Sequence, residues 1–186
     1  MLQPDTYVLL HRMLEVATTN DELEMMLKKF QSVYDATKES INREDLFDAA
    51  WAMSRLATLY SRLHEPFLAE HAYLESIKRF KQIGMALPAA ATCEDLAKLL
   101  VEQGRTSEAE AKLEEEISCL ATVDADENPV EYVEEELNSL RLTGKFTEAC
   151  NYEWFLPYDV YDYGAYVEGE IQGHNEDGWT NQTAHR

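Results

Sequence analysis

Apolar residues recur every three or four positions along most of the first 150 residues, which is the spacing of one face of an α-helix. The clearest stripe runs from Leu46 to Tyr60. This pattern predicts helices over residues 5–17, 20–40, 44–63, 66–83, 89–103, 106–121, 129–143 and 146–153. Apolar and polar residues show no sustained alternation before residue 153, so the fold class is predicted to be all-α.

Glycine and proline mark the ends of these helices. Pro66 stands where the first turn of a helix tolerates proline, and Gly104 stands where a helix commonly ends. Gly84 and Pro88 together are expected to end the helix that starts near Pro66. The elements group into a single predicted domain, residues 1–153, of four helix pairs: 5–40, 44–84, 89–121 and 129–153.

The chain also contains an internal repeat of forty residues. His64, Gly104 and Gly144 are forty positions apart, and an alanine follows each of them five residues later. The segment Gly-Arg-Thr-Ser-Glu-Ala at 104–109 closely matches Gly-Lys-Phe-Thr-Glu-Ala at 144–149. Upstream of the turns, Leu56-Ala57 corresponds to Leu96-Ala97. Helical hairpins stacked side by side are the expected result.

The small and large residues of this repeat resemble the tetratricopeptide repeat family over residues 44–150, in a variant with longer helices. The first copy carries the pattern at Met53, Leu56, Ala57, Tyr60, Ala69 and Tyr73. The second carries it at Cys93, Leu96, Ala97, Leu100, Gly104, Ala109 and Leu113. The third keeps Leu137, Leu140, Gly144 and Ala149 but has Glu136 in place of a leucine, which predicts a shifted or half-exposed helix there. The resemblance implies a right-handed α-solenoid.

In this family the first helices of successive pairs form a concave face that usually holds a peptide, so the resemblance implies a binding groove here. The expected partner-binding residues are Trp51, Ser54, Thr58, Arg62, Glu94, Lys98, Glu131, Glu134, Asn138 and Arg141. Trp51 ranks first as an aromatic anchor, and a core position is its alternative. Some family members clamp a terminal carboxylate at these positions, but Glu94 and Glu134 would repel one. A basic or neutral partner segment is therefore expected.

Charge supports the same expectation. The chain has 36 acidic residues against 16 Lys and Arg, a formal charge of −20, and most of the excess lies after residue 106. Direct nucleic-acid binding is not expected, because it needs a basic surface. No apolar stretch is long enough to span a membrane, and three scattered cysteines fit a reducing compartment. The predicted location is the cytoplasm.

Residues 154–186 form a predicted tail of different composition. Seven aromatic residues fall between 152 and 166, among them Trp154, Phe155, Tyr158 and Tyr161. One interpretation is that this segment packs as a cap on the last helix pair, with a flexible end after it. The alternatives are that it binds a partner, or that it occupies the protein's own groove.

The sequence lacks the phosphate-binding, GxSxG and HExxH patterns, and no metal or cofactor site is expected. Two functions stay open. The first is a non-catalytic adaptor or chaperone-like module that binds a partner segment in the groove or through the tail. The second is an acidic mimic of nucleic acid, in which the runs Glu114–Glu116 and Glu134–Glu136 occupy a basic protein's binding site. The apolar ends of a short array are also compatible with a homodimer.

Overall fold

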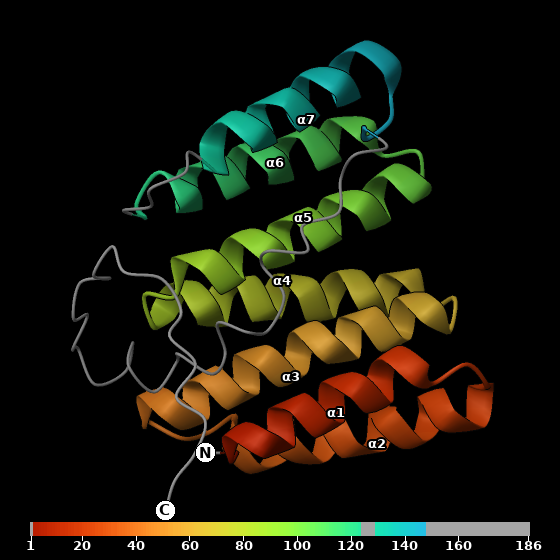
Figure 1. Cartoon of the computed structure of the whole chain (residues 1–186), viewed down its shortest axis with the longest axis vertical. Coiled ribbons are helices and arrows are strands. Elements are labelled where there is room, and N and C mark those ends of the chain that lie inside the picture. Colours follow the sequence, from red (N-terminus) through yellow and green to blue (C-terminus); the bar gives the residue numbers. More distant parts are fainter. Residues whose placement is uncertain (1, 124–128, 148–186) are drawn as a thin grey trace, which may run out of the picture.

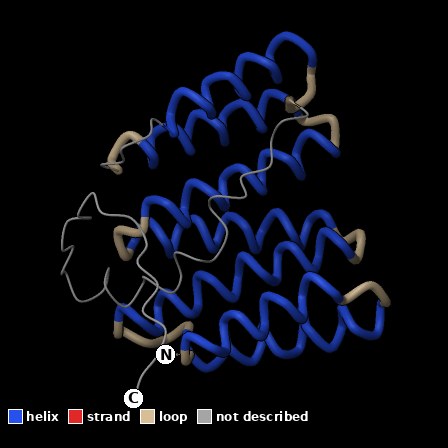
Figure 2. Tube along the Cα trace, viewed as in Figure 1, coloured by secondary structure: helices blue, strands red, loops and turns tan. Residues whose placement is uncertain are grey.

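The computed structural model describes residues 2–123 and 129–147, and these residues are helical with short connections. Seven helices follow one another in this part of the chain, and it contains no strand (Figures 1 and 2). Their bounds are α1 Pro4–Val16, α2 Asn20–Thr37, α3 Arg43–Arg62, α4 Pro66–Gln82, α5 Ala86–Glu102, α6 Thr106–Leu120 and α7 Pro129–Thr143. The all-α prediction is confirmed for the described residues.

The predicted helices agree with the observed ones to within one to three residues. The largest difference at a helix start is at α5, which begins at Ala86 rather than at residue 89. Pro88 therefore lies in the first helical turn, where the missing N–H has no helical partner to lose. The predicted helix 146–153 does not begin where it was expected, since residues 146 and 147 are not helical, and its remainder lies outside the described residues. The tail residues Trp154, Phe155, Tyr158 and Tyr161 also lie outside them.

The turns that follow α3, α4, α5 and α7 share one backbone conformation. His64, Gly84, Gly104 and Gly144 all have a positive φ, between 61° and 74°. After the first of these, the N–H of Glu65 donates to the carbonyl of Tyr60 at 2.8 Å, and Arg105 repeats the bond with Leu100 at 2.9 Å. This is the bonding of a helix that ends in a left-handed residue. His64 adopts a conformation that glycine supplies at the equivalent positions.

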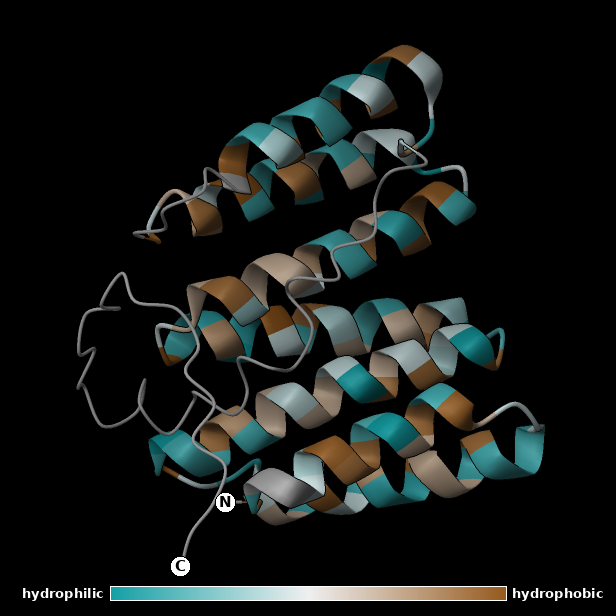
Figure 3. Cartoon of the chain, in the orientation of Figure 1, coloured by the Kyte–Doolittle hydropathy of each residue, from teal (hydrophilic) through white to brown (hydrophobic). Residues whose placement is uncertain are grey.

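From α2 onward each helix packs on the next, and α3 to α7 stack in chain order along the long axis of the molecule (Figure 1). Contacts are most extensive within the pairs α3–α4 and α5–α6. Ala57, Ala69, Ala97 and Ala109 are fully buried in these pairs, and their small side chains let the helices approach closely. Hydrophobic and hydrophilic residues alternate around each helix, as expected for helices with one buried stripe (Figure 3).

The first two helices pack differently. α1 and α2 touch at only a few points, whereas side chains of α1 contact α3. The hydroxyl of Tyr7 donates to the carboxylate of Asp48, which also accepts the N–H of Leu2 at 2.8 Å. The predicted leading pair is thus a looser unit whose first helix is held by α3. No helix in the described part is long and apolar enough to cross a membrane.

Candidate functional site

The first half of the predicted groove is occupied by the protein itself. Trp51 is buried, with its ring packed edge-on against Tyr7 at 4.8 Å and Phe30 at 5.3 Å between centroids. Of the two alternatives for Trp51, the core position is the one observed. The interpretation as an exposed anchor is wrong for this structure, because α1 lies against α3 and covers the indole.

The polar residues of α3 are also engaged internally. Ser54 is buried and donates its hydroxyl to the carbonyl of Trp51 at 2.8 Å, while Thr58 donates to the carbonyl of Ser54 at 3.2 Å. Arg62 donates to the carbonyls of Leu14 and Ala17, so its guanidinium caps the end of α1. Ser54 is therefore not the surface contact that we expected, and Arg62 has a structural partner in the chain.

The second half of the predicted groove remains accessible. Lys98 on α5 is half-buried, and Glu131, Glu134 and Asn138 on α7 are exposed. We call these four residues the α5–α7 face. Arg141 is exposed as well, but it turns to α6 and pairs with Glu110 at 3.2 Å and Glu114 at 2.6 Å. Glu94, the remaining predicted contact, is buried.

Glu94 belongs to a group of three buried glutamates that we call the carboxyl cluster, together with Glu116 and Glu136. They come from α5, α6 and α7, and their exposed fractions are 6%, 2% and 3%. Glu94 interacts electrostatically with each of the other two. Three carboxyl groups thus share the interface where the pair α5–α6 meets α7. Buried acids in such numbers are rare unless each is paired.

The three carboxyl groups are compensated unequally. Glu136 accepts the backbone N–H of Thr147 at 3.0 Å and also the Thr147 hydroxyl. Glu94 forms an ion pair with Lys98 at 2.5 Å, across one helical turn. The Oε2 atom of Glu116 is buried and finds no hydrogen-bond partner among the described residues. Glu116 is therefore the least compensated member of the cluster.

Burial is the main cause of a strong rise in the pKa of Glu116, to about 9, and the charge of Glu94 adds to it. Burial also raises the pKa of Glu94 to about 7, while the hydrogen bond and charge of Lys98 oppose the rise. The pKa of the neighbouring Asp95 is likewise raised by burial, against the charge of Arg55. At neutral pH Glu116 is consequently a protonated acid beside a Glu94 that is close to half ionised.

A forty-residue shift along the sequence points to this cluster. It relates Glu94 to Ser54, Glu116 to Ser76 and Glu136 to Leu96. From the sequence, Glu94 is expected in the groove and Glu116 in an acidic run, and only Glu136 is treated as a departure from the repeat, with its helix shifted or half exposed. That expectation is wrong, because α7 has the predicted bounds and Glu136 is buried. Comparing all buried positions across the shift would have found the other two glutamates.

The cluster is not arranged as a metal site: within residues 2–123 and 129–147, no three His, Cys, Asp or Glu side chains are placed to hold an ion. Comparison with protein-family models, with curated protein sequences and with solved structures finds no match to this chain. The resemblance to tetratricopeptide repeats stays a prediction that rests on the repeated residues. Function has to be inferred from the surfaces of the molecule.

Proposed function

We propose that this chain is a non-catalytic protein-interaction module, and that its α5–α7 face binds a basic or neutral segment of a partner protein. The observation that carries the proposal is the carboxyl cluster, which occupies the buried side of α7 opposite its exposed glutamates. The cluster has one ion-paired cation, Lys98, and among the described residues the Glu116 Oε2 atom has neither a hydrogen bond nor an ion pair. A lysine or arginine from a partner would pair with the exposed carboxylates of α7, and its charge would favour the ionised form of Glu94.

Exposed charges favour the same kind of partner. Glu131, Glu134 and Glu135 are all exposed on α7, whereas Lys98, the cation of the face, is already paired with Glu94. The face therefore presents an excess of negative charge along α7. Such a field attracts basic segments and raises their association rate at low salt.

The proposed architecture is a short right-handed solenoid of the tetratricopeptide type. Its support is the set of buried alanines and left-handed turns that recur at a forty-residue interval. Because α1 covers α3 in the first part of the array, we assign partner binding to the later helices. The cytoplasmic location and the homodimer remain predictions.

The nucleic-acid mimic receives less support. A mimic needs a row of free carboxylates that can stand in for phosphates. In the run Glu114–Glu116, the first residue pairs with Arg141, the second pairs with Lys81 and Lys112, and the third is buried. Glu136 is buried as well. The described parts of the two runs therefore leave no continuous acidic row.

The test is to select peptides from a random display library with the immobilised full chain and then measure the affinity of the selected peptides. We expect an excess of Lys and Arg among them. The double variant E131Q/E134Q should weaken the best peptide by about three- to tenfold at low salt. The matched variant E24Q/E39Q, which removes two exposed charges near α2, should not. Selection of acidic peptides, or equal affinity for both variants, contradicts the proposal.

A further inference from the structure

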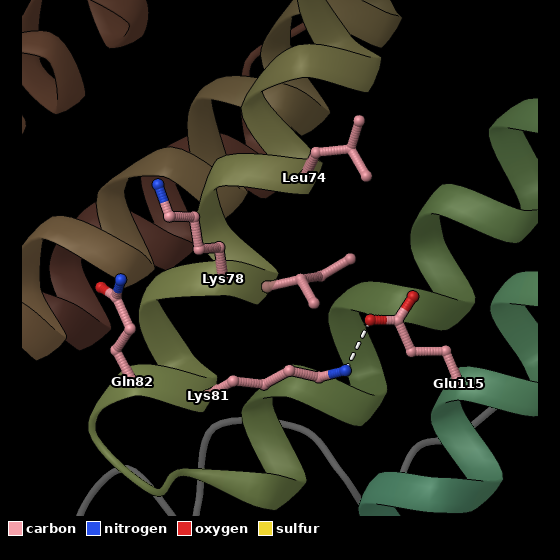
Figure 4. A pocket seen from close by; sticks show the side chains of 6 residues that line it. Leu74, Lys78, Lys81, Gln82 and Glu115 are labelled. Carbon is pink, nitrogen blue, oxygen red and sulfur yellow. Dashed lines mark hydrogen bonds and ion pairs between the residues drawn. The ribbon is translucent and has the colours of Figure 1, made fainter.

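A second surface of the molecule differs from the acidic α5–α7 face because it is apolar and lined by lysines. An open groove of about 480 Å³ lies between α4 and α6, and we call it the α4–α6 groove. It is lined by Leu74, Ile77, Lys78, Lys81 and Gln82 from α4 and by Glu115 from α6. Leu74 and Lys81 extend from α4 toward α6, and Glu115 extends back toward Lys81 (Figure 4).

Ion pairs hold the two helices at a fixed separation along this groove. Near one end, Arg105 binds both carboxylate oxygens of Glu70 at 2.5 and 3.0 Å. At the other end, Glu115 pairs with Lys81 at 2.5 Å and with Lys112 at 2.7 Å. The groove is thus a preformed feature, because links between α4 and α6 bracket it on both sides.

The groove exposes apolar surface. Ile77 is buried beneath it, but Leu74 is 42% exposed. Phe67 stands two turns earlier on the same side of α4 and is 82% exposed. Large apolar side chains along one stripe of a helix indicate a surface that another segment covers.

The α4–α6 groove carries more lysines than carboxylates, whereas the chain as a whole is strongly acidic. Lys78, Lys81 and Lys112 gather at the groove around a single lining carboxylate, Glu115, although the chain carries a formal charge of −20. Lys78 is 65% exposed and pairs with Glu75 only at 3.9 Å. A ligand suited to this groove therefore combines aromatic or aliphatic side chains with negative charge.

The chain contains a segment of that composition. Residues 148–170 include six Asp or Glu and no Lys or Arg, and residues 152–166 include seven aromatic residues. These residues lie outside the described part, which ends at Thr147. Asp159 and Asp162 alternate with tyrosines within the segment.

The link between Thr147 and the aromatic segment is longer than the width of one helix. Thr147 is bonded to Glu136 on α7, and α7 runs antiparallel to α6, because Arg141 contacts Glu110 and Glu114. Five extended residues span about 17 Å, and a helix with its side chains is about 10–12 Å across. The link from Thr147 to residue 152 is therefore long enough to cross α6.

We propose that residues 152–166 of the same chain dock in the α4–α6 groove. Their aromatic side chains cover Leu74 and the stripe of Phe67, and Asp159 and Asp162 lie near Lys78 and Lys81. This contact is independent of the proposed partner binding, because it uses α4 and α6 rather than the α5–α7 face.

A zero-length carbodiimide cross-linker on the full chain tests the proposal, because it joins a lysine to a carboxylate only where the two are in contact. Mass spectrometry should find Asp159 or Asp162 joined to Lys78 or Lys81 at least fivefold more often than to Lys28 and Lys29 on α2. A mixture of ¹⁴N- and ¹⁵N-labelled chains should give links within one chain. Links only between chains, or links spread equally over both lysine pairs, overturn the proposal.

Hydrogen–deuterium exchange provides the second measurement. The variant K78Q/K81Q should speed exchange of residues 152–166 by at least threefold, and K28Q/K29Q should leave it unchanged. If K78Q/K81Q loses helix by circular dichroism, D159N/D162N tests the same contact without altering α4, and it should speed exchange at Leu74 and its neighbours. Unchanged exchange in a folded variant overturns the proposal.

Discussion

Two interfaces along the helical repeat have different side chains at positions that are forty residues apart: one is neutral and the other is acidic. Where α3–α4 meets α5, the positions hold Ser54, Ser76 and Leu96, and both serine hydroxyls donate to carbonyls of α3. Where α5–α6 meets α7, the same positions hold the carboxyl cluster. The backbone repeat thus tolerates either a neutral, satisfied interface or an acidic one. At the neutral interface both serine hydroxyls are hydrogen-bonded within the protein. At the acidic interface the carboxyl group of Glu116 lacks a partner among the described residues.

Exchanging one residue of the neutral interface for its acidic counterpart should have the largest destabilising effect. S76E is expected to lower the free energy of unfolding by about 3–5 kcal/mol at pH 7.5, because it buries an unpaired carboxylate. A carboxylate also cannot donate to the Ala50 carbonyl, which accepts the Ser76 hydroxyl at 2.8 Å. Urea unfolding of the full chain measures the change. S76A, which only loses that bond, should cost about 1 kcal/mol, and an equal loss in both variants would show that the interfaces are interchangeable.

Replacing the buried acid Glu116 of the acidic interface with a neutral residue should stabilise the protein. The pKa of Glu116 is about 9 in the folded chain against an ordinary 4.5. Above pH 4.5 the unfolded chain releases this proton while the folded chain retains it, so stability falls as pH rises toward 9. E116Q removes that dependence and should raise the free energy of unfolding by about 4–5 kcal/mol at pH 8 and by nothing at pH 4.5. A gain that is the same at both pH values, or a loss at pH 8, contradicts this assignment.

The smallest expected effect concerns the cation of the acidic interface. K98M removes the partner of Glu94, whose pKa of about 7 then rises further. Lys98 is partly solvated, so we expect a loss of only about 1 kcal/mol at pH 8, and none at pH 5 where Glu94 is neutral in the folded chain. T58M changes the equivalent residue of the neutral interface, and the stability change that it causes should be the same at pH 5 and pH 8. Thermal unfolding at the two pH values compares the variants, and parallel pH slopes would argue against a special role for Lys98.

Much of the fold could be predicted because its determinants are local and repeated. Glycine supplies three of the four left-handed turn residues, and Ala57 and Ala69 mark a close helix crossing wherever their equivalents recur. The position of α1 could not be predicted in this way. It depends on Tyr7 reaching Asp48 and on Arg62 reaching Leu14, contacts between residues more than forty positions apart.

The contrast between local pattern and long-range contacts also explains which site residues could be predicted from the sequence. The sequence predicted that Lys98, Glu131, Glu134 and Asn138 face outward, because helical spacing alone determines which residues share a face. It could not decide between an anchor and a core position for Trp51, since the helix that covers this residue lies outside the repeat. It did not predict the carboxyl cluster, because the meeting of three glutamates from three helices is a tertiary property.

The left-handed residues at 64, 84, 104 and 144 end α3, α4, α5 and α7, and their spacing limits the lengths of these helices. An α-helix turns by about 100° per residue, so one inserted residue between two such turns would swing the buried stripe a quarter of the way around the axis. A whole forty-residue block could be added or removed with every stripe still facing inward. The molecule can therefore grow or shrink by entire hairpins far more readily than it can accept a single-residue insertion within one.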